Sequence, residues 1–340
     1  MLGRFHEGCM IPAHPLALDA DRRFDERRQR ALTRYYLAAG AGGLAVGVHT
    51  TQFAIHEPSV GLLAPVLELA AETSRGTDTV LVAGVCGPTG QAVAEAELAA
   101  GLGYHLVLLS PQRDLTESEL IDRAKAVGEV LPVVGFYLQP AVGGRTLSRD
   151  FWTRLAALDS VVGIKVAPFD RYRTLDVLYG VVASGRAGEI ALYTGNDDHI
   201  LADLVAPHRI VVDGVPTEVQ FVGGLLGQWA VWARTAAQLL EEARLARGGD
   251  DVALRRLLQL DGHLTDANAA IFDAANGFHG CIPGIHEILR RQGLLAGRWC
   301  LDPAEELSPG QLDRIDRVWA AHPHLRDDEF VAAHLDEWLA

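Results

Sequence analysis

The 340-residue chain has very few lysines, few cysteines and no long apolar run. Only Lys125 and Lys165 are lysine, and the other 28 basic residues are arginine. The four cysteines are scattered without the spacing of a metal site, which favours free thiols in a reducing cytoplasm. No apolar stretch approaches the roughly 18 residues of a membrane helix, and the N-terminal residues lack the apolar core of a signal peptide. These absences predict a cytoplasmic protein that has no membrane partner.

A surplus of basic residues is also absent. The formal net charge is −14, which argues against binding to a nucleic-acid backbone. The acidic residues are spread along the chain, so they favour solubility and do not form an acidic tail. A hydrophobic fraction of 49% in a chain of this length is enough for a large core without disulfides.

Between residue 8 and about residue 240 the chain repeats a short apolar run followed by an amphipathic stretch. Continuous apolar runs are typical of parallel strands that are buried on both faces. Eight such units predict an α/β fold, a (β/α)8 TIM barrel. An open doubly wound sheet is the alternative, but no phosphate-binding Gly-x-Gly-x-x-Gly pattern is present. The predicted strands are Cys9–Ile11, Gly43–Val48, Val80–Val85, Leu106–Leu109, Val133–Leu138, Val161–Ala167, Ile190–Tyr193 and Ile210–Val212.

After residue 240 the apolar runs stop and helical periodicity continues to the end. We therefore predict two domains, a barrel over residues 1–240 and an all-helical extension over residues 241–340. The predicted helices of the extension are Leu254–Ala275, Ile282–Gln292, Pro309–Ala321 and Asp327–Leu339.

Polar side chains stand at the ends of several predicted strands, where the active site of a (β/α)8 barrel lies. Lys165 is in the sixth strand, and an uncharged lysine amine can attack a ketone to form a Schiff base, which arginine cannot do. A nearby phenol, such as Tyr137 at the end of the fifth strand, can carry protons during this reaction. The further candidates are His49 as a catalytic residue, and Thr50, Thr51, Arg145, Asn196 and Asp197 as substrate-binding residues.

Each candidate also has a purely structural interpretation. Lys165 could extend to water from a strand end, and Tyr137 could be a core aromatic with a bonded hydroxyl. Asn196 and Asp197 could cap the following helix. His279 and His286 have no carboxylate partner at metal-ligand spacing, so the sequence predicts no metal site.

The order of these motifs resembles that of the dihydrodipicolinate synthase and N-acetylneuraminate lyase family of class I aldolases. Gly163-Ile164-Lys165 is similar to the family's Schiff-base lysine motif, and Tyr137 with Pro140 is similar to its Tyr-x-x-Pro motif. Thr194-Gly195-Asn196-Asp197 resembles the turn after the seventh strand. The resemblance implies an imine between Lys165 and pyruvate or another 2-oxo acid, with Tyr137 as proton shuttle. It also implies a homo-oligomer, a dimer or tetramer, with no metal and no organic cofactor.

The chain departs from the family pattern in two loops. The family's Gly-Thr-Thr-Gly-Glu loop reads Val48-His49-Thr50-Thr51-Gln52 here, and Ser110-Pro111-Gln112-Arg113 lacks the family's relay tyrosine. We therefore expect a divergent lyase or aldolase that acts on a sugar-derived or other catabolic 2-oxo acid. A Schiff-base dehydratase of a deoxy-2-oxo sugar acid is one alternative. A barrel that has lost catalysis and binds a small acid as a sensor or scaffold is the other.

Overall fold

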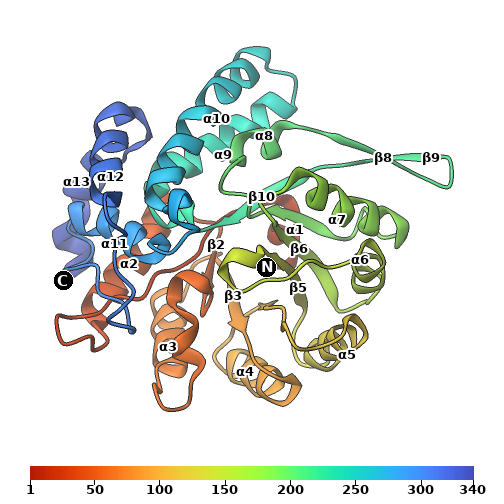
Figure 1. Cartoon of the computed structure of the whole chain (residues 1–340), viewed down its shortest axis with the longest axis horizontal. Coiled ribbons are helices and arrows are strands. Elements are labelled where there is room, and N and C mark those ends of the chain that lie inside the picture. Colours follow the sequence, from red (N-terminus) through yellow and green to blue (C-terminus); the bar gives the residue numbers. More distant parts are fainter.

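The computed structural model describes residues 1–340 and contains a barrel of eight parallel strands (Figure 1). The strand order is β1-β10-β7-β6-β5-β4-β3-β2, and a parallel bridge between Ala13 and Ala45 brings the two ends of this sheet together. The strands are β1 (Met10–Pro12), β2 (Gly43–Val46), β3 (Val80–Val85), β4 (Leu106–Leu109), β5 (Val133–Leu138), β6 (Val161–Ala167), β7 (Ala191–Thr194), β8 (His208–Val212), β9 (Val215–Val219) and β10 (Phe221–Leu226).

The predicted eighth strand is wrong. Ile210–Val212 belongs to β8, which pairs with β9 in a separate antiparallel hairpin, and β10 completes the barrel between β1 and β7. This hairpin extends away from the barrel in Figure 1. Its turn residues Asp213 and Gly214 both have positive φ, as the tight turn of a two-residue hairpin requires. Val215 is 62% exposed and Ile210 is buried, so only one face of the hairpin packs on the protein.

Helices surround the barrel and continue beyond it, as the sequence predicts. Side chains cap several of their N-termini, including Thr116 in a capping box with Glu119 and Ser148 on the backbone of Phe151. The helices are α1 (Leu2–Glu7), α2 (Glu26–Ala39), α3 (Leu63–Thr73), α4 (Thr89–Gly101), α5 (Glu117–Gly128), α6 (Arg149–Ala156), α7 (Arg171–Ala183), α8 (Ile200–Val205), α9 (Ala233–Arg247), α10 (Asp251–Ile271), α11 (Cys281–Arg291), α12 (Gln311–Ala321) and α13 (Asp328–Leu339).

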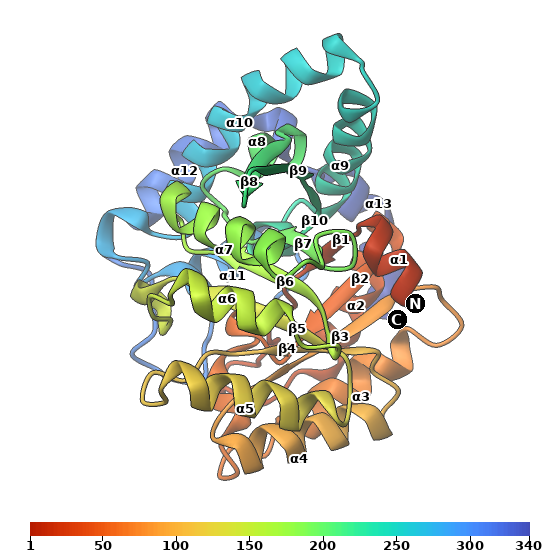
Figure 2. The same ribbon diagram turned by 90° about the vertical axis from the view of Figure 1, so that its right-hand side faces the viewer.

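The C-terminal helices pack on one side of the barrel, next to α2, as both ribbon views show (Figures 1 and 2). The Tyr35 hydroxyl of α2 donates a hydrogen bond of 2.8 Å to Asp327 ahead of α13 and accepts one of 2.7 Å from the backbone of Ala233. One apolar core of 53 buried residues runs through both regions. The predicted boundary at residue 240 lies within α9.

The N-terminal end of the barrel is filled by α1. The Phe5 ring stacks on Tyr193 with 4.5 Å between ring centroids, and the Tyr193 hydroxyl donates a hydrogen bond of 2.6 Å to the Phe5 carbonyl. The opposite, C-terminal end is therefore the open end of the barrel. No helix is both long and apolar enough to cross a membrane.

Candidate active site

A small cavity of about 50 Å³ lies at the C-terminal ends of the barrel strands. Residues after β1, β2, β5, β6 and β7 form its walls, and residues around α11 contribute part of the lining. Ten of the 17 lining residues are hydrophobic. The lining residues are Ala13, Val48, His49, Thr50, Phe136, Leu138, Gln139, Val142, Lys165, Ala167, Phe169, Gly195, Asp197, Gly227, Phe272, Phe278 and Cys281.

Lys165 lies in the wall of this cavity and is almost fully buried. Its side chain is 7% exposed, and Nζ lies 4.4 Å from the centroid of the Phe136 ring. Burial lowers the pKa of Lys165 to about 8, although the Asp197 carboxylate opposes this change. Gly195 leaves room for the lysine stem, because a Cβ at Gly195 would lie 2.8 Å from Cε of Lys165. Lys165 therefore presents an amine that is uncharged at a lower pH than an exposed lysine.

Asp197 is the carboxyl group beside this amine. It is 8% exposed, and burial raises its pKa to about 7. A hydrogen bond of 2.9 Å from the Gln228 backbone and the charge of Lys165 oppose this rise. The Asp197 carbonyl accepts a hydrogen bond of 2.6 Å from Nδ2 of Asn268 in α10. Asp197 thus faces the amine from a turn that α10 holds in place.

His49 and Thr50 form the wall that follows β2. Burial and the charge of Lys165 lower the pKa of His49 to about 4, so its imidazole is neutral at physiological pH. The Thr50 hydroxyl donates a hydrogen bond of 2.7 Å to the Ala13 carbonyl. A neutral imidazole, an amine and a carboxyl group are therefore gathered around one cavity.

Thr51 supports this loop from outside the cavity. Its hydroxyl donates to the His14 carbonyl at 2.7 Å and accepts from the backbone of Gly47 at 3.0 Å. His56 adds a second support, because Nε2 lies 2.8 Å from the Gly47 carbonyl and Nδ1 lies 3.0 Å from the Glu95 carboxylate. Burial disfavours the charge of His56, but its bonds to Cys86 and Glu95 outweigh burial and raise its pKa to about 10. These contacts give Thr51 a structural role in place of the predicted contact with substrate.

Tyr137, which the sequence predicts as the proton shuttle, is not among the residues that line the cavity. Successive strand residues face opposite sides of a sheet, and Phe136 is the residue of β5 in register with Lys165. Tyr137 faces outward, where its ring lies 5.0 Å from that of Trp152 in α6. An apolar ring therefore stands over the amine at the position where the sequence predicted a phenol.

Arg145 and Asn196 also lie outside the cavity lining. The Arg145 guanidinium donates hydrogen bonds to the carbonyls of Arg113 and Leu115, so it holds neighbouring loops together. Asn196 is fully buried, where Nδ2 donates to Asp203 at 2.9 Å and Oδ1 accepts from the backbone of Phe169 at 3.1 Å. The sequence predicts that both side chains bind substrate. In the structure their hydrogen bonds are made to other parts of the protein.

Replacement of Tyr137 by phenylalanine is expected to leave chemistry at Lys165 unchanged. The hydroxyl is removed on the helix side of β5, so the variant should lose stability without losing reactivity toward a 2-oxo acid. Reduction with borohydride in the presence of pyruvate, followed by mass spectrometry, measures this reactivity. If the Tyr137→Phe variant no longer forms an adduct, the Tyr137 hydroxyl takes part in the reaction.

Sequence reasoning missed the aromatic residues of the site. Phe136, Phe169, Phe272 and Phe278 all line the cavity, and the rings of Phe169 and Phe278 meet edge to face with 5.5 Å between centroids. Phe169 and Phe278 also have φ of 53° and 69°, which few non-glycine residues adopt. The continuous apolar sequence of β5 does not show which residues face the cavity, and nothing in the sequence indicated that the segment around Phe278 reaches it.

Comparisons with known proteins agree with this fold. The model of the dihydrodipicolinate synthetase family matches residues 8–212. Solved structures with similar folds include dihydrodipicolinate synthase from Oceanobacillus iheyensis, at 19% identity and a TM-score of 0.73, covering 95% of this chain and 100% of that one. N-acetylneuraminate lyase from Fusobacterium nucleatum matches at 18% identity with the same coverage and TM-score. CdNal from Clostridium difficile, solved in complex with mannosamine, matches at 18% identity and a TM-score of 0.73, covering 92% and 98%.

No curated protein sequence matched the chain. At these identities the solved structures establish the shared fold, while the family model covers more than half of the chain. This family supports assignment as a lyase of the aldolase type. The chain belongs to the dihydrodipicolinate synthetase family.

Proposed function

We propose that this protein is a class I lyase or aldolase that forms an imine between Lys165 and pyruvate or another 2-oxo acid. The observation that carries the proposal is the buried Lys165 amine with a lowered pKa in a cavity that also holds His49 and Asp197. The other lysine, Lys125, is exposed and pairs with Asp122 at 2.9 Å. Lys165 is therefore the amine with the properties of a nucleophile.

The proposed reaction begins with attack of the neutral Lys165 amine on the keto carbon. The nitrogen then loses a proton and the keto oxygen gains one, which gives a neutral carbinolamine. A further proton lets the hydroxyl leave as water while the C=N bond of the iminium forms. The resulting iminium accepts the electron pair of a C–H or C–C bond at the neighbouring carbon. His49 and Asp197 are cavity groups that can carry these protons, and the side-chain amide of Gln139 can bind the substrate carboxylate.

The cavity lining favours a different substrate from the sugar acid that the sequence suggested. Polyhydroxylated substrates need many hydrogen-bonding partners, because a buried polar group without one costs about 1–3 kcal/mol. Here four phenylalanine rings and several aliphatic side chains surround the amine. We therefore propose that the part of the substrate beyond the 2-oxo acid is apolar or aromatic.

A second candidate is a barrel that binds a 2-oxo acid without turnover. The Phe136 ring over Lys165 favours it, because this ring cannot carry protons. The two functions share the imine and differ in the proton transfer that follows. Exchange of the pyruvate methyl protons with deuterium from D2O, followed by NMR, requires that transfer and separates them.

Covalent trapping tests the shared imine. Borohydride added to the wild-type protein with pyruvate should leave one reduced pyruvate on Lys165, located by peptide mass spectrometry. Because only the uncharged amine attacks, the initial rate should rise as the pH increases toward about 8, the pKa of Lys165, and then level off. Absence of the adduct across this pH range would exclude imine chemistry with pyruvate.

A further inference from the structure

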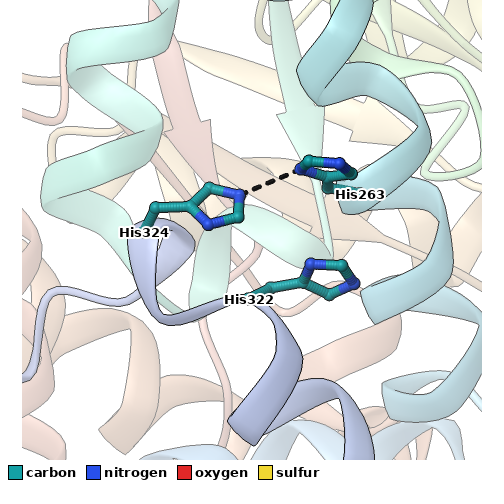
Figure 3. A group of neighbouring side chains, drawn as sticks. All are labelled: His263, His322 and His324. Carbon is teal, nitrogen blue, oxygen red and sulfur yellow. Dashed lines mark hydrogen bonds between the residues drawn. The ribbon is translucent and has the colours of Figure 1, made fainter.

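Three histidines far from the cavity meet on the surface of the C-terminal helices (Figure 3). His263 belongs to α10, His322 follows the last residue of α12, and His324 lies in the short helix Pro323–Leu325. One ring nitrogen from each histidine lies within 4.8 Å of the others, and Nδ1 of His263 is 3.1 Å from Nε2 of His324. The rings of His263 and His322 are stacked with 5.0 Å between centroids.

This spacing is close to that of metal ligands. A tetrahedral zinc ion holds imidazole nitrogens at about 2.0–2.1 Å, which places them about 3.3 Å from one another. The His263–His324 pair is already near this separation, and a nitrogen of His322 lies within 4.8 Å of both.

A carboxylate fixes the orientation of the most buried ring. The side chain of His322 is 12% exposed, and its Nε2 lies 2.9 Å from the carboxylate of Asp266. Asp266 is one turn from His263 on α10 and is itself held by two hydrogen bonds from Arg317, at 2.8 and 2.9 Å. A carboxylate on one imidazole nitrogen leaves the other nitrogen free to bind a metal, as in many zinc sites.

The backbone around the cluster is constrained. Pro323 separates His322 from His324 and limits the conformations of this His-Pro-His segment. The His322 carbonyl also accepts a hydrogen bond of 3.1 Å from the backbone of Leu325. Because His263 and His324 are exposed, an ion and a water ligand can reach the cluster from solvent.

We propose that His263, His322 and His324 bind a divalent transition-metal ion, specifically Zn²⁺ with water as the fourth ligand. Three histidines and a water complete a four-coordinate site for this ion. This site is independent of the imine chemistry at Lys165. Its ion would join α10 to the segment that connects α12 and α13.

The proposed ion would bind a helix that also supports the cavity. The same helix that carries His263 carries Asn268, which holds the Asp197 carbonyl, and it ends just before Phe272 in the cavity wall. An ion that binds only the folded state stabilises that state, and the gain rises with the logarithm of the ion concentration. We therefore expect Zn²⁺ to raise the melting temperature.

The test is a Zn²⁺ titration of the full chain, purified without a polyhistidine tag and stripped with a chelator. Competition with a chromophoric chelator should give one ion per chain, and Co²⁺ should give the visible absorption of a tetrahedral site. His263→Ala and His324→Ala should each abolish both signals and the rise in melting temperature. Asp266→Asn should keep the site but weaken its affinity about 10- to 100-fold.

The matched control is His279→Ala, because His279 is also exposed in the C-terminal region but lies outside the cluster. This variant should bind Zn²⁺ as the wild type does. Far-ultraviolet circular dichroism checks that each variant is folded. Wild-type protein that binds no stoichiometric ion, or folded His263→Ala and His324→Ala variants that bind with wild-type affinity, would overturn the proposal.

Discussion

Lys165→Arg is expected to abolish covalent trapping of pyruvate and any lyase turnover. A guanidinium remains protonated at every pH at which the protein is folded, so it has no lone pair for attack on a ketone. Lys165, in contrast, is buried deeply enough that its pKa falls to about 8 from 10.5. Burial therefore disfavours the ammonium by more than the Asp197 charge favours it. The measurement is the mass of the protein after reduction with borohydride.

The chain provides its own control for this experiment, because its only other lysine is exposed on α5. Lys125→Arg makes the same chemical change outside the barrel and should leave trapping unaffected. Lys165→Met is a second inactive variant, since it keeps the apolar stem without a buried charge. An undiminished adduct in either Lys165 variant would move the nucleophile to another group and remove the basis of the proposed function.

The position of Lys165 could be predicted because it depends on a local pattern. Gly163-Ile164-Lys165 lies in a continuous apolar run, and every residue of that run is in β6. The strands β3, β4, β5 and β6 also match their predicted bounds. Buried parallel strands are apolar along their whole length, so their composition alone separates them from the amphipathic helices.

The sequence analysis placed Tyr137 inside the barrel, but the residue of β5 that faces the interior is its neighbour Phe136. Side chains alternate along a strand, so a shift of one position exchanges the interior of the barrel for the helix layer. A continuous apolar strand carries no alternation from which the facing could be read, and Phe136 and Tyr137 are equally acceptable as core residues. The pairing of Phe136 with Lys165 is a property of the assembled sheet.

The eighth strand was misplaced for a related reason. Ile210–Val212 has strand composition and does form a strand, but its partner is β9 and not the barrel. The actual barrel strand β10 contains Gly223 and Gly224, which weaken its strand signal. Both glycines are required, because a Cβ there would lie 2.4 Å from the Cys9 carbonyl and 2.6 Å from Trp229, respectively.

The histidine cluster was beyond the reach of the sequence because its members are joined by tertiary packing. His322 and His324 are neighbours, but His263 is 59 positions before His322 and meets it only because α10 packs on α12. Along the sequence, His279 and His286 have no carboxylate partner at ligand spacing and therefore predict no metal site. His286 proves to be 1% exposed within α11, where burial lowers its pKa to about 4, so it is a core residue.

His49→Gln is expected to lower the rate of pyruvate methyl-proton exchange by about 10²- to 10⁴-fold, the usual contribution of a general acid or base. His49 is the neutral imidazole of the cavity, with its pKa lowered to about 4 by burial and by the charge of Lys165. Its lone pair is therefore available as a base throughout the neutral range. Glutamine keeps a polar side chain of similar reach but has no basic nitrogen, so imine formation at Lys165 should persist.

The comparison variant for His49 is Asp197→Asn, which removes the other proton carrier of the cavity. Exchange in D2O measured by NMR, with borohydride trapping on the same samples, separates proton transfer from imine formation. If His49 is the base, His49→Gln loses exchange while it retains trapping. If instead Asp197→Asn alone loses exchange, the carboxyl group is the base and His49 only lines the cavity. Because Phe136 provides no phenol, these two variants test the imidazole and the carboxyl group that line the cavity with Lys165.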